Sequence, residues 1–134
     1  MVSMKKRERA WTAVLLFVVV ALTGFGSVAS ERVSFDKGAN SATFTAALGE
    51  GHDYVLGAKA GQTLTVALQG PSDVYFNVVP PSSQDALVNT SITGDARWSG
   101  SVKQDGDYTV RVYQMRSAAR RGKNPTFTIT LAVR

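Results

Sequence analysis

Residues 126–133 (TFTITLAV) place a large apolar side chain at every second position, with threonine or alanine between them. A period of two is typical of a β-strand with one buried and one exposed face, because successive side chains point to opposite sides of the sheet. Comparable runs of five to ten residues recur from residue 30 onward, separated by Gly, Pro, Asp and Asn. No run keeps the 3.6-residue period of an amphipathic helix. The alternation therefore predicts an all-β domain.

The expected strands are short and lie about ten residues apart, a spacing typical of β-sandwiches and barrels. Since no helix is long enough to cross between parallel strands, we expect an antiparallel β-sandwich, jelly-roll-like or a flattened barrel, of about eight strands. The links 59–62 and 104–107 carry turn residues, the second an Asp-Gly pair, so each is expected to join a hairpin. The strands are expected at residues 32–35, 42–48, 53–58, 63–69, 74–79, 86–89, 97–103, 108–115 and 126–133.

Alternation also assigns side chains to faces. In the run 108–115, Arg111 and Tyr113 fall on the opposite face from Tyr108, so both are expected to point outward. Tyr108 follows a turn glycine, the position of a tyrosine whose hydroxyl ties a turn to neighbouring backbone in β-sandwiches. Trp98 is expected to be buried or half-buried in its strand rather than to form a sugar-stacking platform. The core side of the last strand is expected to hold Phe127, Ile129, Leu131 and Val133.

Residues 1–29 have the three parts of a cleavable secretory signal peptide. Basic residues among 1–11 precede the apolar run 13–22 (AVLLFVVVAL), and small residues follow. A membrane-spanning helix needs about 20 apolar residues, more than this run provides. We therefore expect cleavage after Ala29 and a single domain over residues 30–134 in a bacterial periplasm. An uncleaved N-terminal anchor is the alternative.

The chain contains no cysteine, which excludes disulfides, thiolate metal sites and a lipid-modified cysteine at the cleavage point. The product is therefore expected to be soluble and held together by its core. The formal net charge is +5, but the leader holds four of the 15 basic and one of the 10 acidic residues, so residues 30–134 carry +2. For an exported protein with so small a charge, nucleic acid is not an expected partner.

The sequence offers no set of residues for catalysis. Residues 30–134 contain one histidine, His52, and no serine in a G-x-S-x-G motif, so a hydrolase triad is not expected. Asp105 and Asp107 flank a turn glycine, which explains them as turn residues better than as an acid/base pair. The ligand spacing of a zinc or calcium site is missing as well. We expect a protein that is not an enzyme and that needs no cofactor or metal.

The loop after the run 108–115 is the one feature that folding does not require. No acidic residue follows Tyr108, and Arg116, Arg120, Arg121 and Lys123 all lie in this loop. Charged loops on a rigid β-sandwich are common binding elements. The loop therefore predicts a binding surface, with a merely solvated loop as the alternative.

Three segments resemble the periplasmic inhibitors of g-type lysozyme: YVLGAKAGQTLTVAL (54–68), SDVYFNV (72–78) and DGDYTVRVYQMRSAARR (105–121). The most specific part is the pattern R-V-x-Q-x-R-x-x-A-R, which begins at Arg111. The AGQTL portion is also similar to the pre-peptidase C-terminal β-sandwich domains of secreted bacterial peptidases, which lack the arginine pattern. Residues 80–95 depart from the inhibitors and can alter one loop of a binding surface.

The resemblance implies a periplasmic protein that plugs the cleft of a g-type lysozyme with a basic and aromatic loop surface. A lysozyme cleft is built around carboxylates, and the planar fork of arginine binds a carboxylate through two hydrogen bonds. The lysozyme-binding residues that the resemblance implies are Arg116 and Arg120 first, then Arg111, Gln114, Tyr54, Ser72 and Asp73, with plain core packing as the alternative for Tyr54.

A second interpretation belongs to a different class of function. An envelope β-sandwich module of this kind can bind glycan or another protein without inhibiting any enzyme. Binding through stacking on Trp98 would depend little on ionic strength, whereas capture of an acidic cleft by arginines would depend on it strongly.

Overall fold

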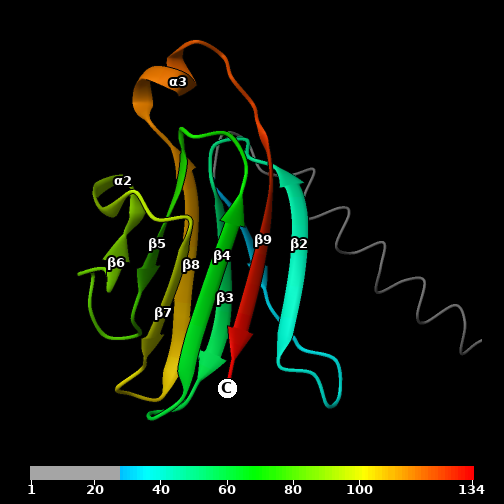
Figure 1. The fold of residues 1–134 in the computed structure, drawn as a ribbon, viewed down its shortest axis with the longest axis vertical. Coiled ribbons are helices and arrows are strands. Elements are labelled where there is room, and N and C mark those ends of the chain that lie inside the picture. Colours follow the sequence, from blue (N-terminus) through cyan, green and yellow to red (C-terminus); the bar gives the residue numbers. More distant parts are fainter. Residues whose placement is uncertain (1–27) are drawn as a thin grey trace, which may run out of the picture.

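The computed structural model describes residues 28–134, which form two β-sheets packed face to face (Figure 1). The expected leader at 1–29 lies outside the described residues except for its last two positions. The β-sandwich expected from the alternation is confirmed. Sheet A contains, in spatial order, β1 (Ala29–Arg32), β3 (His52–Ala58), β8 (Gly106–Gln114), β5 (Val74–Val79) and β6 (Val88–Asn89); sheet B contains β2 (Ser41–Ala47), β9 (Thr126–Val133), β4 (Thr63–Gln69) and β7 (Arg97–Ser101).

Most strands lie where alternation places them. The ranges expected at 63–69, 74–79 and 126–133 coincide with β4, β5 and β9, and five others shift by one or two residues at their ends. The first strand is the exception: it was expected at 32–35 but is β1, which pairs in parallel with β3 rather than antiparallel. This pairing joins segments more than 20 residues apart, so the local pattern could not reveal it.

The prediction that the links 59–62 and 104–107 form hairpins is wrong. The link 59–62 connects β3 in sheet A to β4 in sheet B, and the link 104–107 connects β7 in sheet B to β8 in sheet A. The turn residues do reverse the chain, with Gly61 at φ +94° and Gly106 at φ +142°. Turn chemistry sets a reversal of direction, but it does not decide whether the next strand pairs with its predecessor or crosses to the other sheet.

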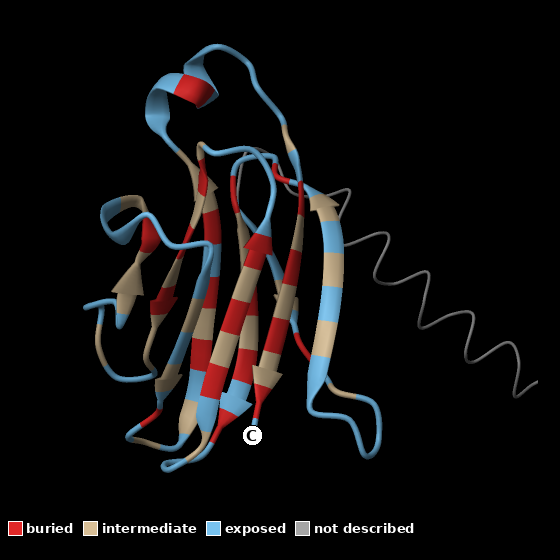
Figure 2. Ribbon diagram, viewed as in Figure 1, coloured by how far each residue is buried: buried red, intermediate tan, exposed pale blue. Residues whose placement is uncertain are grey.

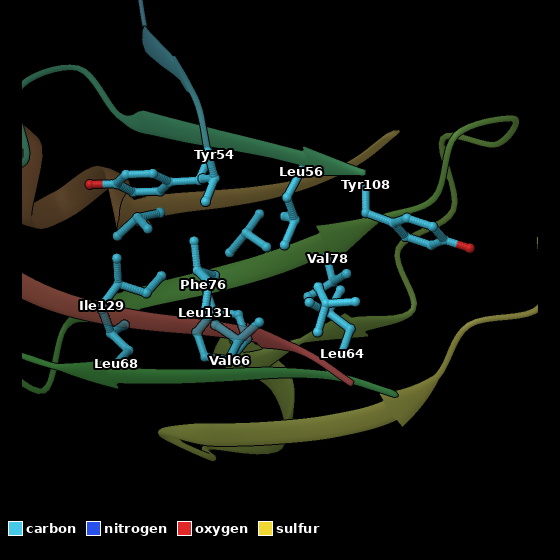
Figure 3. Packing of buried hydrophobic residues seen from close by; sticks show 14 of the residues in the cluster. Tyr54, Leu56, Leu64, Val66, Leu68, Phe76, Val78, Tyr108, Ile129 and Leu131 are labelled. Atoms are coloured by element: carbon cyan, nitrogen blue, oxygen red, sulfur yellow. The ribbon is translucent and has the colours of Figure 1, made fainter. Parts of the chain in front are cut away.

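The core lies between the sheets, and buried residues alternate with exposed ones along the strands (Figure 2). Burying each large apolar side chain stabilises the fold by about 1.5–3 kcal/mol. Figure 3 shows the resulting cluster, with Tyr54 and Tyr108 at its two ends. The core side chains of β9 expected from the sequence are all buried: Phe127, Ile129, Leu131 and Val133.

Two single-residue expectations are confirmed. The hydroxyl of Tyr108 donates to the carbonyl oxygen of Gln104 at 2.7 Å and ties down the turn before β8. Trp98 is half-buried and packs against the core. Its indole covers Gly100 so closely that a Cβ there would overlap the ring. Trp98 therefore serves packing at the edge of sheet B.

Two short helices have no counterpart in the alternation. Helix α2 (Thr90–Thr93) follows β6, and α3 (Arg116–Arg120) follows β8. The buried hydroxyl of Thr90 accepts from the backbone N–H of Phe76 at 2.9 Å and donates to its carbonyl at 3.1 Å. The pairing of β5 with β6 covers only two residues, and the Thr90 hydroxyl satisfies both backbone groups of Phe76 just beyond it. Within residues 28–134, no helix is both long enough and apolar enough to cross a bilayer.

Candidate functional site

Three loops meet at the end of the sandwich that lies away from the C-terminus (Figure 1). They are residues 48–51 between β2 and β3, residues 70–73 between β4 and β5, and residues 115–125 between β8 and β9. We call the last of these the arginine loop. The backbone N–H of Leu48 donates to the carbonyl of Pro125 at 2.9 Å, which joins the first loop to the base of the arginine loop.

Helix α3 carries Arg116 and Arg120 within the arginine loop. Residues four apart share one helix face, so both side chains leave the helix on the same side. Both residues are exposed, and only Ala118 of the helix is buried (Figure 2). None of the ion pairs among residues 28–134 includes Arg116, Arg120 or Arg121. The helix therefore presents positive charge that no described carboxylate compensates.

Lys123 differs from these arginines, because an acid from another loop compensates it. Its Nζ lies 3.7 Å from Oδ2 of Asp73. An acid from the loop 70–73 thus balances Lys123, although the arginine loop itself contains no acidic residue. Asp73 was expected to contact a partner, yet in the structure it is half-buried and faces Lys123.

Two side-chain amides join the arginine loop to its surroundings. Nε2 of Gln114, the last residue of β8, donates to the carbonyl of Lys123 at 2.9 Å. Oδ1 of Asn124 accepts from the backbone N–H of Gly49 at 2.8 Å. The resemblance implies that Gln114 is a contact residue, whereas no sequence pattern marks Asn124.

Arg111 lies outside the arginine loop, on the outer face of sheet A beside Tyr113, as the alternation predicts. Its Nε and Nη2 donate to the two carboxylate oxygens of Asp53 at 2.8 and 2.9 Å. This hydrogen-bonded pair raises the pKa of the Arg111 guanidinium above its ordinary value. Half of its side chain stays exposed, at 51%. Arg111 is therefore accessible, but its fork is already engaged.

Tyr54 is fully buried in the core and is not at the surface. Its ring stacks on His52 at 4.7 Å and on Phe44 at 5.1 Å between centroids. Burial, with a smaller contribution from Glu31, raises the pKa of its hydroxyl well above the ordinary value. Among the described residues that hydroxyl has no hydrogen-bond partner. In this conformation Tyr54 packs in the core beneath the three loops and cannot itself touch a partner. Core packing, the alternative for Tyr54, therefore describes its position.

Ser72 is exposed at the tip of the loop 70–73. Together with Tyr75 and Asp95 it lines a shallow cavity of about 180 Å³ on the β4–β5 side. A second cavity of about 80 Å³ lies between the loop 48–51 and the arginine loop and is lined in part by Gln114 and Ala119. Ser72, Arg116 and Arg120 are thus the expected site residues that the structure leaves exposed at this end.

The acidic residues and the histidine that a catalytic site would use have structural partners. Asp105 accepts from the backbone N–H of Ala60 at 2.8 Å, and Asp107 binds Arg32 at 2.7 and 2.8 Å. His52 begins β3 and stacks in the aromatic cluster. Within residues 28–134, no group of three or more His, Cys, Asp or Glu side chains is placed to hold a metal ion.

Sequence reasoning missed Gly49, Asn124 and the pair between Lys123 and Asp73. Gly49 and Asn124 are 75 residues apart in the chain. A glycine and an asparagine in separate loops carry no local signal of contact, because both are ordinary turn residues. Only the packing of the two sheets brings these loops together.

Comparison with known proteins finds similar sequences and structures, although no protein-family model matches the chain. The inhibitor of g-type lysozyme from Escherichia coli (strain K12) is 29% identical over 127 residues, covering 91% of this chain and 94% of that protein. The structure of Aeromonas hydrophila PliG, a periplasmic lysozyme inhibitor of g-type lysozyme, is 35% identical with a TM-score of 0.72, covering 80% of this chain and 97% of that chain.

Two further structures share the fold. Salmonella Typhimurium PliG, also a periplasmic lysozyme inhibitor of g-type lysozyme, is 23% identical with a TM-score of 0.66, covering 79% of this chain and 98% of that chain. The pre-peptidase C-terminal domain of Bacillus anthracis collagenase is 12% identical with a TM-score of 0.53, covering 81% of this chain and 95% of that chain, which confirms the weaker similarity to such domains. With the Aeromonas protein matched over nearly its whole length, the chain belongs to the family of periplasmic inhibitors of g-type lysozyme.

Proposed function

We propose that this protein is a periplasmic inhibitor of g-type lysozyme and that it blocks the enzyme by inserting the arginine loop into the active-site cleft. Family membership supports the target and the compartment. The observation that carries the mode of binding is the pair Arg116 and Arg120, exposed on one face of α3 without a described acidic partner. The inhibitor performs no reaction.

The chemistry of a lysozyme cleft suits such a loop. Glycoside hydrolysis uses carboxylates that flank the scissile bond, so the cleft is acidic where substrate binds. A guanidinium meets a carboxylate with two parallel hydrogen bonds and keeps its charge at every physiological pH. Two arginines on one helix face can therefore occupy the place of the substrate and pair with the acids that would cleave it.

The other expected site residues take different roles in this proposal. Ser72 stands on the neighbouring loop and can donate or accept a hydrogen bond at the rim of the interface. Arg111 lies further down sheet A and would contribute at the periphery, since Asp53 already binds its fork. Tyr54 and Asp73 would affect inhibition indirectly, by supporting the three loops at this end of the sandwich.

The double variant Arg116→Ala with Arg120→Ala tests the site. We expect inhibition of a g-type lysozyme to weaken at least tenfold, or about 1.4 kcal/mol of binding free energy. The melting temperature should stay within about one degree of the parent value, because exposed side chains without partners contribute little to stability. Inhibition is measured as the concentration that halves peptidoglycan lysis.

A matched control removes the same charge elsewhere. Lys103→Ala with Arg134→Ala takes two exposed basic residues from the opposite end of the sandwich (Figure 1). This variant should inhibit as the parent does. Equal inhibition by the parent and the Arg116, Arg120 double variant would show that the arginine loop is not the binding site.

The leader is part of the same proposal. Cleavage after Ala29 would leave Ser30 to Arg32 of β1 paired with β3 and would keep Arg32 bound to Asp107. The mass of the exported protein should therefore correspond to residues 30–134. A mass that includes residues 1–29 would support the uncleaved anchor instead.

A further inference from the structure

Helix α3 is too short to be stable by itself. It contains five residues, and its N-cap residue Met115 makes no side-chain capping hydrogen bond. Isolated helices of fewer than about 12 residues are marginal in water, because the first turn fixes several residues for one hydrogen bond. Of its five side chains only that of Ala118 is buried. Contacts outside the helix must therefore keep it formed.

Two side-chain hydrogen bonds provide such contacts, beside the backbone hydrogen bond between Leu48 and Pro125, and both act on the segment that follows the helix. Gln114 donates from Nε2 to the carbonyl of Lys123, which bridges the two ends of the arginine loop. Asn124 accepts from the N–H of Gly49 and fixes the end of the loop to the neighbouring loop. Both distances, 2.9 and 2.8 Å, are those of well-formed hydrogen bonds.

Neither polar atom of the Gln114 amide is free at the surface. Its Nε2 is engaged with Lys123, and its Oε1 is buried. A side chain in this position has little to offer a partner protein directly. Its effect on inhibition would have to pass through the shape of the loop.

The ion pair between Lys123 and Asp73 is the weaker tie. Its atoms are 3.7 Å apart, and the lysine side chain is 52% exposed. Exposed ion pairs of this kind contribute little, since water and salt screen them and both side chains lose freedom. Among the side-chain ties, the two amide hydrogen bonds to backbone are therefore the stronger ones.

We propose that Gln114 and Asn124 are positioning residues, which hold the arginine loop in its binding conformation before lysozyme arrives. This inference rests on the proposed function. If the loop forms only part of the time, the apparent dissociation constant equals the intrinsic one divided by the populated fraction. Loss of either tie should thus weaken binding although no contact with lysozyme is removed.

Three variants separate positioning from contact and from charge. Gln114→Glu keeps the side-chain size but removes the donor to the carbonyl of Lys123. Asn124→Asp keeps the acceptor for the N–H of Gly49, and it adds the same single negative charge as Gln114→Glu. Asn124→Leu keeps the branched shape and the number of side-chain heavy atoms, and it removes the acceptor. Each variant is tested for affinity to a g-type lysozyme, melting temperature, and amide hydrogen exchange of residues 116–123 in the free protein.

We expect Gln114→Glu and Asn124→Leu to lose about tenfold in affinity and to exchange the amides of residues 116–123 at least several-fold faster. Asn124→Asp should stay within about threefold of the parent in both measurements, with all three variants folded in the melting experiment. Loss of affinity without faster exchange would overturn the proposal, because Gln114 or Asn124 would then be a direct contact. Faster exchange with unchanged affinity would overturn it too.

Failure of the proposed function would look different. If the parent protein did not bind g-type lysozyme at all, the affinity measurements would reject that function. The exchange comparison would still decide whether Gln114 and Asn124 order the loop, and unchanged exchange in both disruptive variants would reject that role independently.

Discussion

Tyr54 and Tyr108 are both fully buried, yet their hydroxyl groups have different surroundings (Figure 3). The hydroxyl of Tyr108 donates to the Gln104 carbonyl, whereas that of Tyr54 has no partner among the described residues. A buried hydrogen bond contributes about 0.5–1.5 kcal/mol net, while a buried polar group without a partner costs free energy. The same substitution should therefore have different consequences for stability at the two positions.

We predict that Tyr108→Phe lowers the free energy of unfolding by about 1 kcal/mol, because the Gln104 carbonyl loses its donor. Tyr54→Phe should leave stability unchanged or raise it, since no described hydrogen bond is lost. Urea denaturation of both variants measures this difference. Tyr54→Phe should also inhibit lysozyme as the parent does; a marked loss would mean that its hydroxyl reaches the partner.

At the scale of elements, β1 is attached to sheet A by more than its pairing with β3. Arg32 of β1 binds both carboxylate oxygens of Asp107 on β8, two strands away. Gly57 of β3 lies between them. A Cβ placed on Gly57 would lie 3.7 Å from Nη2 of Arg32 and 3.8 Å from Oδ1 of Asp107. These are ordinary van der Waals distances, so the ion pair crosses β3 directly over Gly57 and would still have room beside a single Cβ.

This ion pair predicts a dependence of stability on pH. The hydrogen bond from Arg32 holds the pKa of Asp107 below its ordinary value. Since the folded-state pKa lies below the unfolded-state value of about 3.9, the pair stabilises the protein above that pH. Its contribution is lost as the pH falls through the folded-state pKa. The parent should therefore melt at a higher temperature than Asp107→Asn at pH 6, and the gap should close as the pH falls through the folded-state pKa of Asp107.

Asp85→Asn is the control, because Asp85 is exposed and belongs to none of the ion pairs among residues 28–134. It should follow the parent across the whole range. A gap between the parent and Asp107→Asn that persisted at low pH would show that the substitution acts through something other than the charge of Asp107.

Alternation predicted the strands because it is a local property. Strands β4, β5 and β9 have the bounds expected from their sequences. Sheet membership is a property of pairs of strands, so the links 59–62 and 104–107 were mistaken for hairpins. Helix α3 was missed for a related reason: five residues are too few to show a helical period, and the ties that hold it come from β8 and from the loop 48–51.

The candidate site was predictable where charge alone defines it. Arg116 and Arg120 stand out in the sequence because no acidic residue follows Tyr108. Burial and pairing across the fold decided the others: Tyr54 belongs to the core, Asp73 pairs with Lys123, and Gln114 binds backbone. None of these relations follows from spacing along the chain.

At the scale of the whole molecule, the net charge of residues 30–134 is only +2, but the arginine loop concentrates positive charge at one end. Charges further apart than the Debye length, about 8 Å at physiological salt, are largely screened. Only charges close to the cleft should therefore attract it. As the two proteins approach each other, those charges are the ones on the arginine loop.

We predict that association with g-type lysozyme slows on the order of tenfold between 50 and 500 mM salt, because steering by exposed charges is screened. The variant lacking Arg116 and Arg120 should show a shallower dependence. Stopped-flow or surface-binding kinetics at several ionic strengths measure both. An association rate that ignored salt would favour binding through stacking, as expected of a glycan-binding module.

The most direct test uses residues 30–134 with three classes of lysozyme. Peptidoglycan lysis by g-type, c-type and i-type enzymes is measured with and without the protein. The proposed function predicts that lysis by the g-type enzyme is lost while lysis by the other two continues. No effect on any of the three enzymes would contradict it and would favour an envelope module that binds glycan or protein without inhibition.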